Sequence, residues 1–246
     1  MTTAKISHVP QIQLLCMEKQ FAVAFAKARK IWELHESVSV QVHECPLIYL
    51  SEDVQFDTIV SPANSYGRLD GAFDDAISRA LSPRDDYLAL THVAQRQLYE
   101  QWRGFAPPGT CTLVRIPDKF RARSRNVWGT RRVALCPTMR TPTNVTWDRE
   151  IVYECMWSLL CAIDNHNRDV REGKTAEGEE IRSVLMTPLA TGVGRVSPEK
   201  WASQAVLAIN HFVQASENPE KWSRLDWADF DGPCEEVAAT WRETQT

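Results

Sequence analysis

The stretch SPANSYGRLDGAFDDAI, residues 61–77, directly follows the apolar run FDTIV at 56–60. It places an asparagine, two glycines and several acids where a β-rich segment passes into a helix-compatible one, GAFDDAISRAL at 71–81. In alternating α/β folds, ligands lie beyond the carboxyl ends of strands, where loops rise and helices begin. The stretch is therefore the first candidate for a ligand-binding loop.

The same alternation runs through the rest of the chain. Further strand-like segments are QIQLLCM at 11–17, VSVQVHEC at 38–45, TCTLVRI at 110–116, RRVALC at 131–136 and IRSVLMT at 181–187. Helical apolar spacing covers 84–103 and about 147–166, and a further helix opens at Ser197-Pro198, where Ser can cap and Pro suits the first turn. The charged segment 167–180 has the composition of a solvated loop. This pattern predicts an α/β fold.

Residues 1–216 are predicted to form the main domain, because the chain of 246 residues is 43% hydrophobic and can bury a substantial core. Residues 217–246 form a polar tail with Trp222, Trp227 and Trp241. Leaving three indoles in water would create large apolar patches, so we expect this appendage to pack on the main domain.

Charge and cysteine usage restrict the function classes. The formal net charge of −4 provides no global basic field for nucleic acid or anionic membranes, and no segment approaches the ~20 apolar residues of a membrane span. Seven cysteines form no CxxC pair, which favours reduced thiols. The six histidines show no metal-ligand spacing. We therefore expect an intracellular protein, cytoplasmic or nuclear, with no metal and no cofactor.

A second loop, PLATGVGR at 188–195, carries Gly192 and Gly194 between a strand and a helix. Its backbone amides could cradle a diphosphate, although a bare glycine turn explains the same residues. In the first loop, the amide of Asn64 suits a sugar hydroxyl, and Asp74 in a first helical turn could orient or deprotonate a water. The alternative is that Asn64 shapes a turn, while Asp74 and Asp75 are ordinary N-terminal helix acids.

Three spaced segments, DTIVSPANS at 57–65, DGAFDDAI at 70–77 and ATGVGR at 190–195, together resemble the macro domain family. The segment CPTMRTP at 136–142 resembles one branch of that family, and the whole resemblance covers roughly residues 38–214. It implies a three-layer α/β/α fold with a mixed central sheet. It also implies binding of ADP-ribose and, as in many members, cleavage of ADP-ribose derivatives.

Carried over by position, the resemblance assigns the catalytic roles to Asn64, which would contact the distal ribose, and to Asp74, which would position a water. It places Glu44 at the adenine amino group. Gly67 and Gly71 would let the backbone approach the ligand. The full set of implied ligand-binding residues is Glu44, Ala63, Asn64, Gly67, Gly71, Thr191, Gly192, Val193, Gly194 and Arg195.

The chain also departs from the family pattern. Asp70 and Ala72 replace two glycines, and could restrict the first loop or add repulsion near a diphosphate. Gly194 and Arg195 stand where many members have an aromatic residue and then glycine. The resemblance therefore predicts a lost stacking contact, and Arg195 is either a phosphate-pairing cation or a surface arginine.

Three functions follow from these observations. The leading one is hydrolysis at the distal ribose of ADP-ribosylated protein, O-acetyl-ADP-ribose or ADP-ribose 1″-phosphate. The alternative is a non-catalytic ADP-ribose reader whose tail contacts a protein partner. A third, nucleic-acid binding, is motivated only by the six basic residues of KFRARSRNVWGTRR at 119–132, for which a solvated connection is the favoured interpretation.

Overall fold

The computed structural model describes residues 8–175 and 179–242. Its strands form one six-stranded sheet in the order β2-β1-β6-β3-β5-β4. The β4–β5 pair is antiparallel, whereas the other neighbouring pairs are parallel. The strands are β1 Gln11–Leu15, β2 Val40–His43, β3 Thr58–Ser61, β4 Thr112–Arg115, β5 Arg132–Leu135 and β6 Ser183–Met186.

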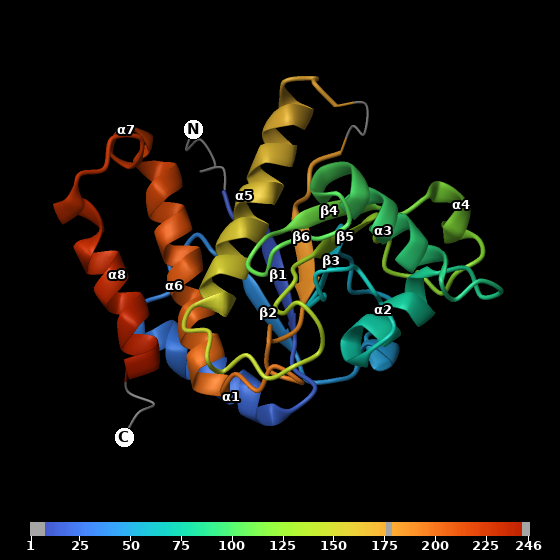
Figure 1. The fold of residues 1–246 in the computed structure, drawn as a ribbon, viewed down its shortest axis with the longest axis horizontal. Helices are drawn as coiled ribbons and strands as arrows, with labels where there is room; N and C mark the ends of the chain where they lie inside the picture. The colour runs from blue at the N-terminus through green and yellow to red at the C-terminus, as the bar shows by residue number, and fades with distance from the viewer. Residues whose placement is uncertain (1–7, 176–178, 243–246) are drawn as a thin grey trace.

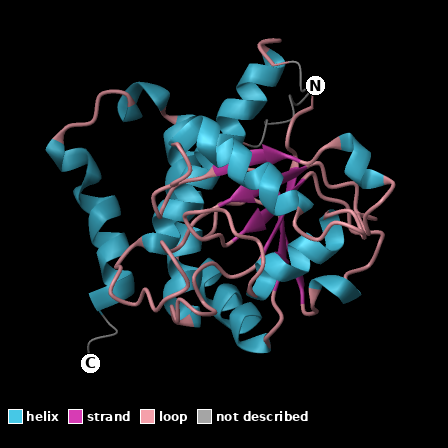
Figure 2. Cartoon of the chain, turned by 45° about the vertical axis from the view of Figure 1, so that its right-hand side comes forward, coloured by secondary structure: helices cyan, strands magenta, loops and turns pink. Residues whose placement is uncertain are grey.

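Helices lie on both faces of this sheet (Figures 1 and 2). The helices of the described residues are α1 Lys19–Ile31, η1 Leu47–Tyr49, α2 Ala72–Leu81, α3 Ala89–Trp102, α4 Asp118–Arg121, α5 Ile151–Arg171, α6 Pro198–Glu217, α7 Pro219–Trp222 and α8 Trp227–Arg242. The predicted cap of α6 is confirmed, because the Ser197 hydroxyl accepts the Lys200 amide at 3.2 Å. In the described part of the chain, no helix has the length and apolar character needed to cross a bilayer.

Two hydrophobic cores form on opposite faces of the sheet because successive strand side chains point in opposite directions. In β1, Leu14 packs into the core beneath α1, α5 and α6, whereas Leu15 packs into the core beneath α2, α3 and α4. In β6, Val184 and Leu185 divide in the same way. This arrangement confirms the predicted three-layer α/β/α fold with a mixed central sheet.

Two predicted element boundaries are corrected. The helix expected over 84–103 begins only at Ala89. The segment expected as a solvated loop from residue 167 begins inside α5, which continues to Arg171. The reason is a long-range contact: the side-chain amide of Asn167 donates to the Ile181 carbonyl at 2.9 Å and accepts its N–H at 2.7 Å. Residues 176–178 of that expected loop lie outside the described residues.

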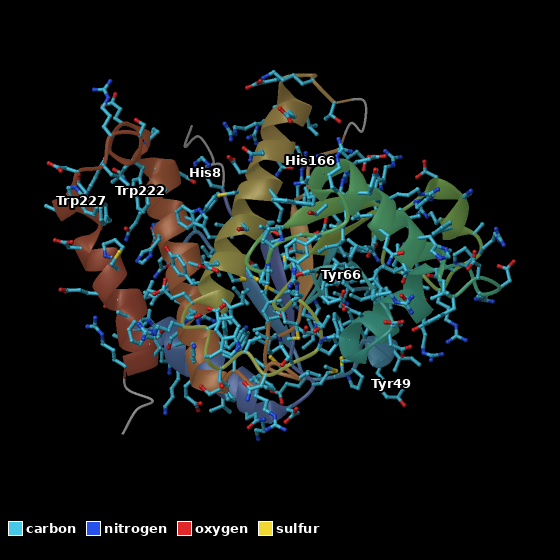
Figure 3. The ribbon with its side chains drawn as sticks, in the orientation of Figure 1. His8, Tyr49, Tyr66, His166, Trp222 and Trp227 are labelled. Carbon is cyan, nitrogen blue, oxygen red and sulfur yellow. The ribbon has the colours of Figure 1, made fainter. Side chains whose placement is uncertain are left out.

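The tail contacts the rest of the chain through α5 and α6, and its last residues, 243–246, lie outside the described part. The Trp222 ring stacks on Trp157 of α5 with the ring centroids 5.8 Å apart. Trp227, by contrast, is 78% exposed at the outer edge (Figure 3). Only some of the tail's indoles are therefore covered by the protein.

Helix α8 lies along α6 and is joined to it by hydrogen bonds (Figure 1). Gln204 donates to the Thr240 hydroxyl at 3.0 Å, and the buried His211 ring contacts the Glu236 carboxylate at 2.8 Å. The guanidinium of Arg149 lies 4.4 Å from the centre of the Trp241 ring. These contacts bind the tail to the sheet domain on the α6 side.

Trp222→Ala should loosen the tail, because it removes the stacked ring pair on Trp157, an interaction of about 0.5–1.5 kcal/mol beyond burial. We expect faster limited proteolysis after residue 217 and a lower melting temperature. Trp227→Ala is the matched control, since that ring is largely exposed, and should leave both measurements unchanged. Equal protease sensitivity of the two variants would contradict this account of the docking.

Candidate functional site

A cavity of about 300 Å³ lies at the carboxyl ends of the central strands. Its walls come from the segment between β3 and α2, the loops after β5 and β6, and the start of α1. The lining includes these sequence-predicted residues: Ala63, Asn64, Gly71, Asp74, Thr191, Gly192, Val193 and Gly194. The predicted residues Glu44, Gly67 and Arg195 are not part of the lining.

The loop after β6 is a tight reversal. The Val196 amide donates to the Ala190 carbonyl at 3.1 Å, and the Arg195 amide donates to the Gly192 carbonyl at 3.0 Å. Gly194 is required by this reversal, because an added Cβ would lie 2.4 Å from the Ala190 carbonyl oxygen. Arg195 takes a left-handed φ of 58° at the end of the loop, and it is exposed.

The reversal leaves a run of backbone donors at the cavity. Among the residues that the structure describes, the amides of Thr191, Gly192, Val193 and Gly194 donate to no other group. An added Cβ at Gly192 would meet nothing within 4 Å, so this part of the loop is open to a ligand. Consecutive unsatisfied amides at a concave surface are suited to an anion such as a diphosphate.

Asp74 is the buried acid of the cavity. It lies in the first turn of α2 and is 6% exposed, and its Oδ1 accepts the Ser61 hydroxyl at 2.6 Å. Burial raises the pKa of this carboxyl to about 7, and the nearby charge of Asp70 acts in the same direction, while the Ser61 bond opposes it. A carboxyl with such a pKa can change protonation state near neutral pH.

The amide of Asn64 is largely used by its own loop. Its Oδ1 accepts the backbone N–H groups of Tyr66 and Arg68, at 3.1 and 3.3 Å, and its Nδ2 donates to the Arg68 carbonyl at 2.8 Å. Within the protein, Asn64 therefore shapes the turn, as one of the two sequence interpretations expected. The described contacts use one of the two Nδ2 hydrogens, and Asn64 lines the cavity.

Thr138 is a cavity residue that the motif analysis missed. It is 1% exposed, and its hydroxyl has no hydrogen-bond partner in the described structure. Its backbone N–H donates to the Ala63 carbonyl at 3.0 Å, which places it beside the Asn64 loop. A buried hydroxyl without a partner is costly, and a ligand hydroxyl or phosphate could satisfy it. Its place in the CPTMRTP segment was the available sequence signal.

Arg68, and not Arg195, supplies the cation of the lining. Its guanidinium pairs with Asp70, with Nε to Oδ2 at 3.0 Å, and both side chains line the cavity. The repulsion expected from Asp70 at a glycine position is thus offset within the loop. The other replaced glycine, Ala72, takes a φ of 49°, in the left-handed region that favours glycine.

Two other predicted residues have different surroundings. Gly67 has a φ of 64° and packs against α3, where an added Cβ would lie 2.8 Å from a Leu98 methyl carbon. The lack of a side chain at Gly67 thus allows its backbone to pack against Leu98 of α3. Glu44 is exposed after the edge strand β2 and is not part of the lining, whereas Glu18 at the start of α1 is the glutamate of the lining. Met17, Phe21 and Phe73 give the cavity an apolar part that the motifs did not indicate.

The basic stretch 119–132 is partly neutralised. Arg123 pairs with Asp85, Arg131 pairs with Glu179, and Arg132 is a buried strand residue.

No group of three or more His, Cys, Asp or Glu residues suited to a metal ion occurs in the described residues. These observations leave the cavity between the two loops as the candidate site.

Gly194→Ala should disrupt the loop after β6, because its Cβ would meet the Ala190 carbonyl. We expect the free energy of unfolding to fall by about 1–3 kcal/mol, measured by urea denaturation. Gly192→Ala adds the same methyl group where space is open, and should change stability by less than about 0.5 kcal/mol. Similar losses in the two variants would refute the proposed geometry of the reversal.

Asp74→Asn should stabilise the protein increasingly as pH rises. The unfolded carboxyl titrates near 3.8 and the folded one near 7, so this residue's contribution to stability is full below the lower value and is lost as pH rises through the upper one. Asparagine does not titrate. The variant's advantage should therefore grow, by up to a few kcal/mol, between about pH 4 and pH 7 in urea denaturation.

Asp75→Asn is the matched control on the same helical turn. Hydrogen bonds from Arg79 and Tyr87 lower the pKa of Asp75, so the ionised form stabilises the folded protein above the ordinary pKa of the group. Its removal should lower stability at neutral pH, opposite in sign to Asp74→Asn. A pH-independent difference between Asp74→Asn and wild type would show that Asp74 is not held in a desolvated site.

No family model matches the chain, and no curated protein matches it either. A comparison with solved structures retrieves macrodomain structures from Oceanobacillus iheyensis. One with ADP is 19% identical, with a TM-score of 0.43, and the match covers 65% of this chain and 70% of that chain. A mutant form with ADPR is 17% identical, with a TM-score of 0.45, and the match covers 66% and 74%. A form with MES bound is 18% identical, with a TM-score of 0.44 and coverage of 66% and 72%.

Proposed function

We propose that this chain is a macro domain protein that binds ADP-ribose, or a derivative, in the cavity between the two loops. The observation that carries the proposal is the presence, in one cavity, of the open amides of Thr191–Gly194 and the buried acid Asp74. The amides suit a diphosphate, and the carboxyl of Asp74 suits proton transfer at a sugar. Their combination matches an ADP-ribose ligand better than a simple mononucleotide.

The diphosphate would lie on the loop after β6. There the amides would donate to its oxygens, and the exposed Gly192 would allow close backbone approach. Arg68 would supply positive charge from the opposite wall, while remaining paired with Asp70. The adenine would occupy the apolar part near Phe21, with Glu18 in the accepting role that the sequence resemblance gave to Glu44.

The distal ribose would lie between Asn64, Thr138 and Asp74. The remaining Nδ2 hydrogen of Asn64 and the unpaired hydroxyl of Thr138 are hydrogen-bonding groups suited to sugar hydroxyls. Because Asn64 also fixes its own loop, its replacement should weaken both ligand affinity and turnover. Asn64 would thus both contact the ribose and shape the turn.

We further propose hydrolysis of a bond at that ribose. The ionised carboxylate of Asp74 would orient a water and accept one of its protons as the water oxygen bonds to the electrophilic atom of the substrate. That atom is the anomeric carbon in an ADP-ribosylated protein, the acyl carbon in O-acetyl-ADP-ribose and the anomeric carbon or phosphorus in ADP-ribose 1″-phosphate. The bond to the leaving group breaks, and the leaving group takes up the proton. The candidate substrates are ADP-ribosylated protein, O-acetyl-ADP-ribose and ADP-ribose 1″-phosphate. The intracellular setting proposed for the protein is consistent with its seven free cysteines.

A non-catalytic reader is the second candidate. It is favoured by the substituted loop, in which Ala72 takes a left-handed backbone conformation and Asp70 adds a carboxylate to the cavity lining. It is also favoured by the burial of Asp74, whose protonated form cannot accept a proton from water. A reader would bind ADP-ribose with the same loops and release no product.

Asp74→Asn should separate these functions. It keeps the shape of the side chain and the acceptor for Ser61, so ADP-ribose affinity by calorimetry should change little, whereas turnover of the three substrates should fall by about 10²- to 10⁴-fold. Wild-type turnover should rise as pH passes through about 7, because Asp74 must ionise to act.

Asp75→Asn makes the same chemical change one residue along and outside the cavity lining, so it should retain turnover of the two substrates that carry no protein chain, O-acetyl-ADP-ribose and ADP-ribose 1″-phosphate. Unchanged turnover in Asp74→Asn would remove Asp74 from the mechanism. Tight binding of ADP-ribose by the wild type without turnover of any of the three substrates would replace the hydrolase with the reader.

A further inference from the structure

A second cavity, of about 530 Å³, lies beside the first one across the start of α2. Asp70 lines both cavities, so the two adjoin at this residue. Asp74 faces the first cavity, whereas the next residue, Asp75, faces the second. The charged and aromatic residues of the second cavity are Asp70, Asp75, Arg79, Arg84, Tyr87 and Arg125.

The backbone holds two of these arginines at the same cavity. The Arg84 amide donates to the Arg123 carbonyl at 2.9 Å, and the Arg125 amide donates to the Ala80 carbonyl at 2.9 Å, at the end of α2. An ion pair between Arg123 and Asp85 adds a third connection between the two segments. The segments carrying Arg84 and Arg125 are therefore fixed side by side by main-chain bonds, independently of the arginine side chains.

The second cavity has an excess of positive charge. Both oxygens of Asp75 are occupied, one by Arg79 Nε at 2.7 Å and the other by the Tyr87 hydroxyl at 2.6 Å. Asp70 is paired with Arg68. In the described part of the structure, the guanidiniums of Arg84 and Arg125 have no carboxylate partner.

We propose that this cavity binds the acidic peptide that flanks an ADP-ribosylated residue, with its carboxylates on Arg84 and Arg125. This inference rests on the proposed function, which places the distal ribose at Asp74. A protein chain attached to that ribose would pass Asp70 and enter the second cavity. Guanidinium groups are suited to paired, bidentate recognition of carboxylates.

An acidic peptide fits the surroundings better than a polynucleotide does. Single-stranded nucleic acid is normally held by exposed aromatic faces on which its bases stack. Here the Tyr87 ring carries the Arg79 guanidinium 5.4 Å from its centre. Phe120 and Trp128 of the neighbouring basic stretch are each only 5% exposed. The cavity thus offers charge without a stacking surface.

The test compares wild type with the double variant Arg84→Gln/Arg125→Gln. Glutamine keeps both backbone amides that connect the two segments, so the fold should be preserved. The probe is a fluorescein-labelled glutamate-rich peptide of about ten residues, measured by anisotropy with and without ADP-ribosylation. We expect the Kd of both peptide forms to rise roughly 3- to 30-fold in the double variant, and wild-type binding to weaken with added salt.

Two controls keep the interpretations separate. Arg29→Gln/Lys30→Gln removes the same charge from the exposed end of α1 and should leave the Kd of the peptide unchanged. The Kd of free ADP-ribose should stay within about two-fold of wild type in both double variants, because these cations are not part of the first cavity's lining. Failure of wild type to bind ADP-ribose would refute the proposed function, whereas arginine-dependent binding of the unmodified peptide would still support the anion site.

Equal binding of the peptide to wild type and to Arg84→Gln/Arg125→Gln would overturn the proposal. So would tighter, arginine-dependent binding of a thymidine oligonucleotide of equal charge, because the cavity would then be a phosphate site. A rise in KM for the ADP-ribosylated peptide, without a change in kcat or in the turnover of O-acetyl-ADP-ribose, would support recognition of the acceptor.

Discussion

The parallel pairing of β3 with β6 is the constraint on which the rest of the site depends. Thr58 lies opposite Val184, and Ile59 lies opposite Leu185, so the two strands end at the same edge of the sheet. Each is followed by one of the informative loops, although these loops are separated by more than a hundred residues in the sequence. The pairing brings the two loops together around one cavity, because parallel strands direct their following loops to the same side of the sheet.

The first turn of α2 carries two adjacent acids, Asp74 and Asp75, that face different cavities. Asp74 is buried beside Ser61, whereas its neighbour Asp75 is held by a cation and a hydroxyl on the other side of the helix. Burial raises the pKa of the first carboxyl, and hydrogen bonding to Arg79 and Tyr87 lowers that of the second. Two side chains of the same type, adjacent in the chain, therefore have pKa values shifted in opposite directions by their surroundings.

The departures from the family pattern are accommodated locally. Arg68 offsets the charge of Asp70, and Ala72 keeps a backbone conformation that favours glycine. In the described residues, the backbone amides of the loop after β6 remain open. Arg68, and not the predicted Arg195, lines the cavity, and Thr138 adds a hydroxyl that has no hydrogen-bond partner among the described residues.

The sequence by itself determined the alternation of strands and helices, the Ser197 cap and the two glycine-bearing loops, because periodicity, capping and turn chemistry act within a few residues. It could not determine that Asn167 would extend α5 by bonding Ile181, or that Glu18 and not Glu44 would reach the cavity. Those outcomes depend on which distant segments meet. Tertiary structure decided them, since strand order and packing set distances that no local pattern contains.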